Sequence, residues 1–412
     1  MSFINPFPDL KATHIPDWKK YLRRQTLLES WDTQRAKLPT NFPQKAESPS
    51  VWSWEELDLE SVTHDLTSLE IEEIDEALRN FKKENILLNQ ISCENFSLPT
   101  LGRHLDRIAH EIFKGKGIAS IRGLSPDMYS VKDNVIIHAG ISSHIAPFRG
   151  NQSGSNDQVL HICNREDMGI ADLKAPSTAQ SLPFHTDDTD VLAFYAIEAS
   201  MAGGEMLWAS HGKVYNELAA TRPEVLGVLA ESDWPVETET EPSDYVRLPL
   251  LYNDDQGPYF WLARGNLTGT ERTPRPLGIP GLTLAQADAL DAVHFAAERH
   301  SIRIAPRKGE LYFVNNLSIL HSRTAFQDSD VKDEKHPRAR RRHILRLWLR
   351  DPAYGRRMIG RLEQRWSQVF DTELSRKRGR WLLSRDMVPE VISEKLFREK
   401  FPVGTVSSCQ NA

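Results

Sequence analysis

The 412-residue sequence is poor in cysteine, with only Cys93, Cys163 and Cys409, which lie far apart. No CxxC pair occurs, so a disulfide framework or a structural zinc site built on sulfur is not expected. This cysteine usage fits a reducing compartment, and we expect a cytoplasmic protein.

Long apolar runs are also missing. No stretch approaches the roughly 18 apolar residues that a membrane span requires, and the N-terminal segment MSFINPFPDLKATHIPDWKK lacks the basic and apolar regions of a secretory signal. The formal net charge of −6 shows no basic excess. The basic run at 338–342 has no interleaved aromatic residues. We therefore expect neither a membrane nor a nucleic-acid partner.

The chain is rich enough in apolar residues, at 40%, to form a sizeable core. Residues 1–50 show no clean periodicity and predict an extended arm along the core or a partly disordered segment. Apolar spacing of three and four predicts helices at 69–86, 98–117, 213–231, 282–302 and 356–370. Strand-like patterns occupy 117–124, 158–163, 182–187, 191–199, 246–254, 258–264, 309–316 and 343–351.

These strands do not alternate regularly with helices, which disfavours a doubly wound parallel sheet. The order of elements instead favours a mainly β protein with helical decoration. We expect a core formed by an antiparallel double-stranded β-helix, or jelly roll.

The segment LPFHTDDTD, residues 182–190, places His185 and Asp187 two positions apart in a strand-like stretch. Side chains at i and i+2 of a strand point to the same face, so the imidazole and the carboxylate would converge. Such a pair suits a divalent metal, although the pair alone is more typical of a solvated surface strand.

A third ligand is expected from a distant strand, and the best candidate is His321, just beyond the strand-like segment 309–316. His185, Asp187 and His321 would form a 2-His-1-carboxylate set, which leaves adjacent positions on iron(II) open for oxygen and a chelating cosubstrate. A structural zinc ion would instead require four closed ligands. His321 as a hydrogen-bonded residue at a strand end is the alternative.

The segment RRRHILRLWLRD places Arg342 and Arg346 on one face of a predicted strand, together with Ile344 and Trp348. Two buried guanidinium groups are unfavourable without an anion, so this face predicts a bound acid. Arg342 could otherwise belong to the exposed basic run. Arg346 could contact a substrate, a cosubstrate or a structural ion-pair partner.

The sequence resembles the TauD/TfdA family of iron(II)- and 2-oxoglutarate-dependent dioxygenases, a clavaminate synthase-like group, and its fungal branch in particular. The resemblance covers residues 110–352 and is carried by LPFHTDDTD, YNELAATRPEVL, NNLSILHSRTAF and RHILRLWLRD. It implies that His185, Asp187 and His321 bind Fe(II), while Arg342 holds the C5 carboxylate of 2-oxoglutarate. Arg346 would assist the cosubstrate or contact an anionic substrate group.

The same resemblance implies oxidation of a C–H bond by O2, with decarboxylation of 2-oxoglutarate to succinate. Hydroxylation, desaturation and oxidative cyclisation all remain open for a small anionic or zwitterionic substrate, such as an amino acid or sulfonate, in secondary metabolism or sulfonate catabolism. We expect a monomer or homodimer. A non-catalytic metabolite-binding relative and a jelly-roll metal enzyme without 2-oxoglutarate are the alternatives.

The expected domain organisation has three parts. Residues 1–105 would form an N-terminal arm and helices packed on the core. Residues 106–352 would form the jelly-roll oxygenase domain, with a helical insertion at about 211–300. Residues 353–412 would form a C-terminal helical extension.

Two features depart from the family pattern. Where relatives carry a hydroxyl donor to 2-oxoglutarate after a Gly-Gly pair, this chain has Met206, and Ser210 is a possible replacement. The long loop at 327–340 also leaves Arg340 and Arg341 as competitors of Arg342. Asn316 matches a recurrent family residue that would support the turn before His321.

Overall fold

A computed structural model describes residues 7–31, 38–152, 156–170, 173–238, 244–329 and 341–383. Within these ranges the α-helices are α1 (Trp18–Trp31), α2 (Ser68–Lys83), α3 (Leu101–Lys114), α4 (Val131–Ile145), α5 (His211–Thr221), α6 (Pro223–Ala230), α7 (Gly265–Thr268), α8 (Leu284–His300), α9 (Arg361–Val369) and α10 (Thr372–Arg378). None of them is both long enough and apolar enough to cross a bilayer.

The strands of the larger sheet run in the order β1 (Thr63–Asp65), β2 (Ile118–Arg122), β14 (Leu311–Asn315), β6 (Val191–Glu198), β17 (His343–Arg350), β4 (Asp157–Ile162) and β18 (Arg380–Trp381), with β3 (Phe148–Arg149) also paired to β17. The smaller sheet runs β13 (Ile302–Ile304), β8 (Met206–Ser210), β15 (Ile319–Arg323) and β5 (Leu182–His185). Short two-stranded pairs are β9 (Trp234–Glu237) with β10 (Tyr245–Leu248), β11 (Leu251–Asp254) with β12 (Gly257–Phe260), and β7 (Ala202–Gly203) with β16 (Phe326–Gln327).

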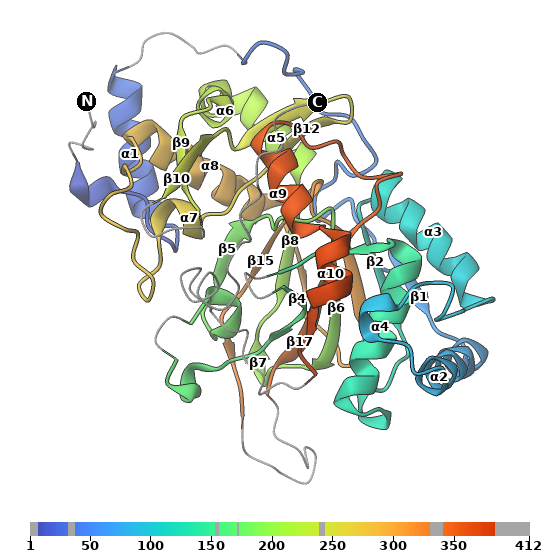
Figure 1. Ribbon diagram of the computed structural model, residues 1–412. Coiled ribbons are helices and arrows are strands. Elements are labelled where there is room, and N and C mark those ends of the chain that lie inside the picture. The colour runs from blue at the N-terminus through green and yellow to red at the C-terminus, as the bar shows by residue number, and fades with distance from the viewer. Residues whose placement is uncertain are drawn as a thin grey trace, which may run out of the picture.

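The two larger sheets share one apolar core, which contains Leu192 and Ile344 from one sheet and Trp208 and Ile319 from the other. The central pairs β14–β6, β6–β17 and β17–β4 are antiparallel, and parallel pairs occur only at the described edges, β1–β2 and β4–β18. This arrangement confirms the jelly roll with helical decoration (Figure 1).

Strand β17 is buried on both faces, and its alternating side chains pack into two different cores. Leu345, Leu347 and Leu349 pack into a second core with helices α2, α3 and α4, which cover the outer face of the sheet (Figure 1). Ile344 and Trp348 belong to the core between the sheets. Arg346 therefore points inward, as the sequence predicts, because side chains two apart share a face.

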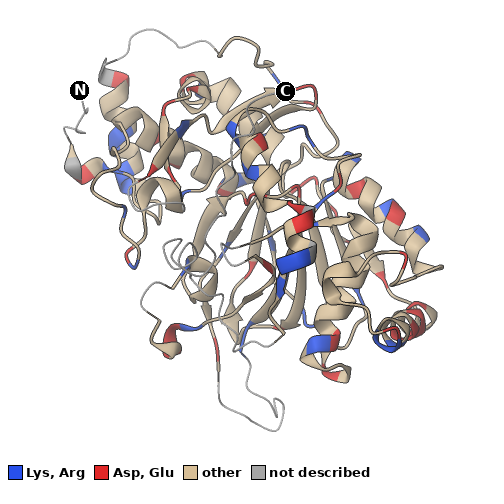
Figure 2. Ribbon diagram, viewed as in Figure 1, with Lys and Arg blue, Asp and Glu red and all other residues tan. Residues whose placement is uncertain are grey.

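Charged residues of both signs are mixed over the outer helices, while the central strands carry few (Figure 2). Arg346 is thus an exception within the sheet. Its presence there requires a partner, because a buried unpaired charge is strongly unfavourable.

The predicted arm at residues 1–50 is only partly right, because it contains helix α1. Trp18 and Tyr21 of α1 pack against Phe295 of α8, with ring centroids 4.8 and 5.1 Å apart. The helix also buries Arg24, which is fully inaccessible to solvent. A charged residue on the packed face hides the apolar periodicity by which such a helix is recognised.

The domain division stays a prediction, and residues 384–412 lie outside the described ranges. Strand β1 extends the larger sheet from the N-terminal region, and β18 extends it from the C-terminal region. Helices α5 to α8 lie between residues 211 and 300.

The buried carboxylate of Asp291 in α8 ties the N-terminal segment to the body of the protein. It accepts hydrogen bonds from Arg24 and, at 2.5 Å, from Arg264. The same guanidinium groups donate to the carbonyl oxygens of Leu10 and Thr13, at 2.8 and 2.9 Å. One carboxylate is thus the shared ion-pair partner of two buried cations.

Replacing Asp291 with Ala should lower the free energy of unfolding by about 3–5 kcal/mol, because two guanidinium groups would remain buried without a counter-charge. Urea denaturation measures this loss. Glu298→Ala, at an exposed position of the same helix, is the control and should change stability by less than about 0.5 kcal/mol. Equal stabilities of the two variants would contradict the assignment.

Candidate active site

The pairing of β5 with β15 brings two predicted metal ligands together. His185 and His321 stand directly opposite each other in the register of the two strands. Their ring centroids are 4.0 Å apart. Residues separated by more than 130 positions in the sequence therefore present adjacent imidazoles.

Asp187 is the second residue after β5 ends at His185, so it lies in the loop and not on the strand itself. Its carboxylate nevertheless turns toward the two rings. His185 Nε2 lies 4.0 Å from Oδ1, and His321 Nε2 lies 3.9 Å from Oδ2. Ligand atoms of all three residues fall within 4.8 Å of one another, so the structure gathers the predicted triad.

Asn316, between β14 and β15, holds the loop that carries Asp187. Its side-chain oxygen accepts from the Asp187 backbone N–H at 2.9 Å. Its side-chain nitrogen donates to the carbonyl oxygens of Asp187 and Thr189, both at 2.7 Å. Asn316 was expected to support the turn before His321, but its side chain supports the loop that carries Asp187, which explains how a loop residue keeps a defined position.

The protonation states of the triad suit a metal cation. His185 Nδ1 lies 2.9 Å from the carbonyl oxygen of Pro183, which can only accept, so Nδ1 carries the proton and Nε2 presents its lone pair. Burial lowers the pKa of His185 and, more strongly, that of His321. Burial alone would raise the pKa of Asp187, but Arg346 and the imidazoles outweigh this effect and lower it.

The inner face of β17 holds one oxygen of the carboxylate. Arg346 Nη1 and Trp348 Nε1 donate to Asp187 Oδ2 at 2.7 and 3.1 Å. Gln152 fixes the guanidinium by accepting from Arg346 Nε at 2.9 Å and donating to the Arg346 carbonyl at 2.8 Å. No hydrogen bond to Oδ1 is found within the described parts of the chain, so this oxygen remains available to a metal.

A second group of buried cations surrounds the ring of Phe326. The guanidinium carbons of Arg323 and Arg342 lie 5.0 and 5.3 Å from the ring centroid. Both side chains are buried, and the Nε and Nη1 atoms of each have no hydrogen-bond partner in the described structure. Arg323 uses its remaining nitrogen, Nη2, to donate to the carbonyl oxygens of Thr178 and Gln180.

Both guanidinium groups remain charged at neutral pH. Burial lowers the pKa of Arg342 to about 10. Burial and the nearby charge of Arg342 lower the pKa of Arg323 to about 9. Arg323 also lies close enough to His185 for its charge to lower the pKa of that imidazole. The two cations, whose buried Nε and Nη1 donors have no partner in the described structure, thus adjoin the triad and provide a site for an anion.

The Gly-Gly-Glu-Met segment approaches this anion site closely. Gly204 has φ of +77°, and a Cβ atom there would lie 3.2 Å from Arg342 Nε, so glycine leaves room for the guanidinium. Met206 stands directly opposite Arg323 in the β8–β15 register. Arg323 therefore presents its guanidinium group to Met206, the position at which relatives carry the hydroxyl donor.

Ser210 does not replace the missing hydroxyl. It lies at the far end of β8, four residues or about 13 Å from Met206 at the usual rise of a strand. There its side chain accepts from the backbone N–H of Lys213 at 3.2 Å and caps helix α5.

His14, from the N-terminal segment, lies near the triad. Burial lowers its pKa to about 4, with further contributions from the charges of Arg264 and His185. Its Nδ1 is buried and has no hydrogen-bond partner among the described residues. Its ring lines a small cavity together with Gln180, Leu182, Glu271 and Arg272.

Comparisons with known proteins agree with this geometry. The sequence profile of the family "Taurine catabolism dioxygenase TauD, TfdA family" matches residues 71–348. "Taurine hydroxylase-like protein SAT17" of Stachybotrys chartarum is 31% identical over 337 residues, covering 80% of this chain and 85% of that protein. "FR-33289 synthase" of Streptomyces rubellomurinus is 23% identical over 284 residues, covering 67% of this chain and 81% of that protein.

A solved structure of asparagine oxygenase in complex with Fe(II), 2S,3S-3-hydroxyasparagine and succinate has the same fold. It superposes with a TM-score of 0.51 at 15% sequence identity, covering 71% of this chain and 98% of that chain.

The jelly roll and its His-x-Asp…His cluster define a non-haem iron oxygenase. The chain belongs to the TauD/TfdA family. It is a dioxygenase that uses iron(II) and 2-oxoglutarate and oxidises a small molecule. Among the hypotheses left open by the sequence, family membership supports the oxygenase.

Arg323 and His14 lie near the triad, but neither was predicted from the sequence to belong to the site. Arg323 is two residues after His321, and strand alternation would have placed it on the same face. His14 carried no comparable signal, because its position depends on how the N-terminal segment folds back. The competitor Arg340 lies outside the described residues.

Asn316→Ala should weaken binding of iron(II) by roughly 10- to 100-fold, because the loop carrying Asp187 loses the hydrogen bonds that orient its carboxylate. Anaerobic titration with Fe(II) measures the change, and circular dichroism confirms that the variant is folded. Asn80→Ala, on the exposed face of α2, is the control. An unchanged affinity in folded Asn316→Ala protein would contradict this supporting role.

Proposed function

We propose that His185, Asp187 and His321 hold Fe(II) and that Arg342, assisted by Arg323, holds the distal carboxylate of 2-oxoglutarate. The observation that carries this proposal is the juxtaposition of the triad with two buried guanidinium groups that have unpaired donors. A dicarboxylate whose other end chelates the metal fits both requirements.

When bound, iron(II), 2-oxoglutarate and O2 together supply the oxidising chemistry, in which 2-oxoglutarate yields succinate and carbon dioxide and a substrate C–H bond is oxidised. The chain's residues provide position and environment. Asp187 presents Oδ1 to the metal while Arg346 and Trp348 hold Oδ2. The buried imidazoles offer nitrogen lone pairs in fixed orientations.

Of the three roles open for Arg346, its contacts support the structural ion pair. Its guanidinium is engaged by Asp187 and Gln152. We propose that Arg346 keeps Asp187 ionised and oriented, and that cosubstrate binding falls mainly to Arg342 and Arg323. Arg323, which faces Met206 across the strands, would supply the donor that the Gly-Gly-Glu-Met segment lacks.

Arg342→Met should raise the KM for 2-oxoglutarate by about 10- to 100-fold, because a charged, hydrogen-bonded contact to the carboxylate is lost. Arg323→Met should raise it by about 10-fold. Succinate formation at varied 2-oxoglutarate measures both. Arg341→Met, at the neighbouring, more exposed residue that pairs with Asp167, is the matched control and should leave KM unchanged.

The unliganded stability of the same variants separates a binding role from a structural one. Removing an unpaired buried charge should leave the free energy of unfolding unchanged or raise it. A larger KM effect in Arg341→Met than in Arg342→Met would show that the anchor is misassigned. A large loss of stability in Arg342→Met would show that this cation has a structural counter-charge.

We propose that the substrate is a small zwitterion or anion, such as an amino acid or an aminosulfonate. Glu271 and Arg272 lie beside His14 and offer both signs of charge to a molecule with an amine and an acid, although the small cavity that they line together must widen to admit one. The names of the relatives point the same way, because one is called taurine hydroxylase-like and the solved structure holds 3-hydroxyasparagine.

A panel of amino acids and aminosulfonates should contain a compound that accelerates succinate release above the substrate-free rate and is itself oxidised. For that compound, His14→Ala should raise KM several-fold without changing substrate-free succinate release, because the unpartnered ring nitrogen contacts the substrate. Lys11→Ala is the control at an exposed position of the same segment. Substrate-free turnover alone, across the whole panel, would contradict the substrate class.

A further inference from the structure

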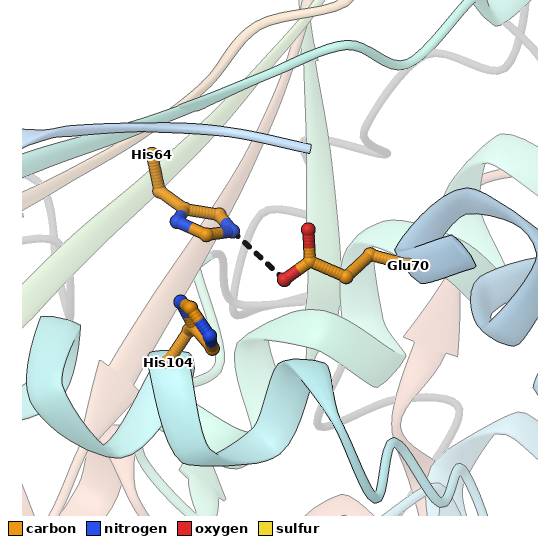
Figure 3. Close-up of side chains that lie close together, drawn as sticks. All are labelled: His64, Glu70 and His104. Carbon is orange, nitrogen blue, oxygen red and sulfur yellow. Dashed lines mark hydrogen bonds and ion pairs between the residues drawn. The ribbon is translucent and has the colours of Figure 1, made fainter. Parts of the chain in front are cut away.

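A second cluster of metal-ligating side chains lies at the edge strand of the larger sheet. His64 of β1, Glu70 of α2 and His104 of α3 converge there, and one ligand atom from each falls within 4.8 Å of the others. Figure 3 shows the two rings and the carboxylate turned toward a common centre. The triad described above lies on a different part of the sheet system, between β5 and β15.

The carboxylate of Glu70 is buried, with 2% exposure, and is held rigidly. Its Oε2 accepts from the backbone N–H and the hydroxyl of Thr67, at 2.8 and 2.9 Å, as part of the capping box of α2. Its Oε1 is directed to His64 Nε2 at 3.0 Å. One oxygen is thus anchored by the helix cap, while the other faces the imidazoles, an arrangement typical of an oriented metal ligand.

His104 gives the cluster a third donor with no other evident use. Its ring lies over that of His64, with centroids 4.5 Å apart and an interplanar angle of 52°. In the described part of the chain neither ring nitrogen of His104 has a hydrogen-bond partner. A His64–Glu70 hydrogen bond would not require a second imidazole beside it, whereas a shared cation would.

We propose that His64, Glu70 and His104 form a second metal site that binds Zn(II). Two imidazole nitrogens and one carboxylate oxygen are ligands that zinc accepts, and a water molecule would complete a tetrahedron at this partly exposed position. The ion would take the place of the His64–Glu70 hydrogen bond and join three elements that contribute one ligand each.

The expected consequence is structural. Strand β1 has three residues, and among the described strands it pairs only with β2, in parallel. A short edge strand has few ladder hydrogen bonds to hold it. Zinc bound to the folded state alone would stabilise that state by mass action and would fasten β1 to α2 and α3.

Zinc stoichiometry tests the proposal, because the triad and the new site can be counted separately. After dialysis against Zn(II), the full chain should retain two equivalents by elemental analysis. His104→Ala and His64→Ala should each retain one, and His185→Ala should also retain one, at the new site. His110→Ala, an exposed histidine on the same helix as His104, should retain two.

The His185→Ala protein then isolates the new site. Added Zn(II) should raise its melting temperature, and Co(II) should give the visible absorption of a tetrahedral site. Both responses should disappear when His104→Ala or His64→Ala is combined with it. Either of two results would overturn the proposal without affecting the iron site. In the first, His185→Ala retains no zinc. In the second, it retains zinc even after His104→Ala or His64→Ala has been added.

Discussion

The site depends on keeping one carboxylate ionised inside the protein. Asp187 is largely buried, which by itself favours its neutral form, and Arg346 reverses that preference through a 2.7 Å contact. Arg346 comes from the larger sheet, whereas His185 and His321 come from the smaller one. The charge pair therefore works only if the two sheets are packed face to face. The jelly roll provides that packing, so fold and protonation state are coupled.

The buried cations of this protein fall into two kinds. Asp291 pairs directly with both Arg24 and Arg264, and each guanidinium also donates to a carbonyl oxygen. Arg323 and Arg342, by contrast, retain unpaired donors and lie close enough to lower the pKa of Arg323. The first arrangement stabilises the fold. The second leaves stabilisation to be completed by a bound anion, because buried charge without a partner is unfavourable.

The sequence predicted the triad and the central strands β2, β14, β6, β17 and β4 of the larger sheet, because both have strong local signals, but it did not predict β8, β13 and β15 of the smaller sheet. Strand β17 shows a clear alternation, and His185 and Asp187 stand within three residues of each other. Helix α4 was not predicted, since it is buried almost all round and has no polar face to reveal its period. The orientation of Asp187 could not be predicted either, because the loop is shaped by Asn316, more than 120 residues away.

The three arginines of the site show why residue type alone does not determine a role. Arg346 lies on the inner face of β17 opposite Asp187 and becomes part of an ion pair. Arg342 precedes the strand and reaches the ring of Phe326. Arg323 follows a register irregularity between itself and His321 in the β15–β5 pairing. The extra residue belongs to β5, whereas β15 keeps a regular register with β8. Arg323 therefore lies on the same face as His321, two residues further along the strand, at the neighbouring anion site. The register of the strands, which depends on long-range pairing, therefore determines which function each of these arginines has.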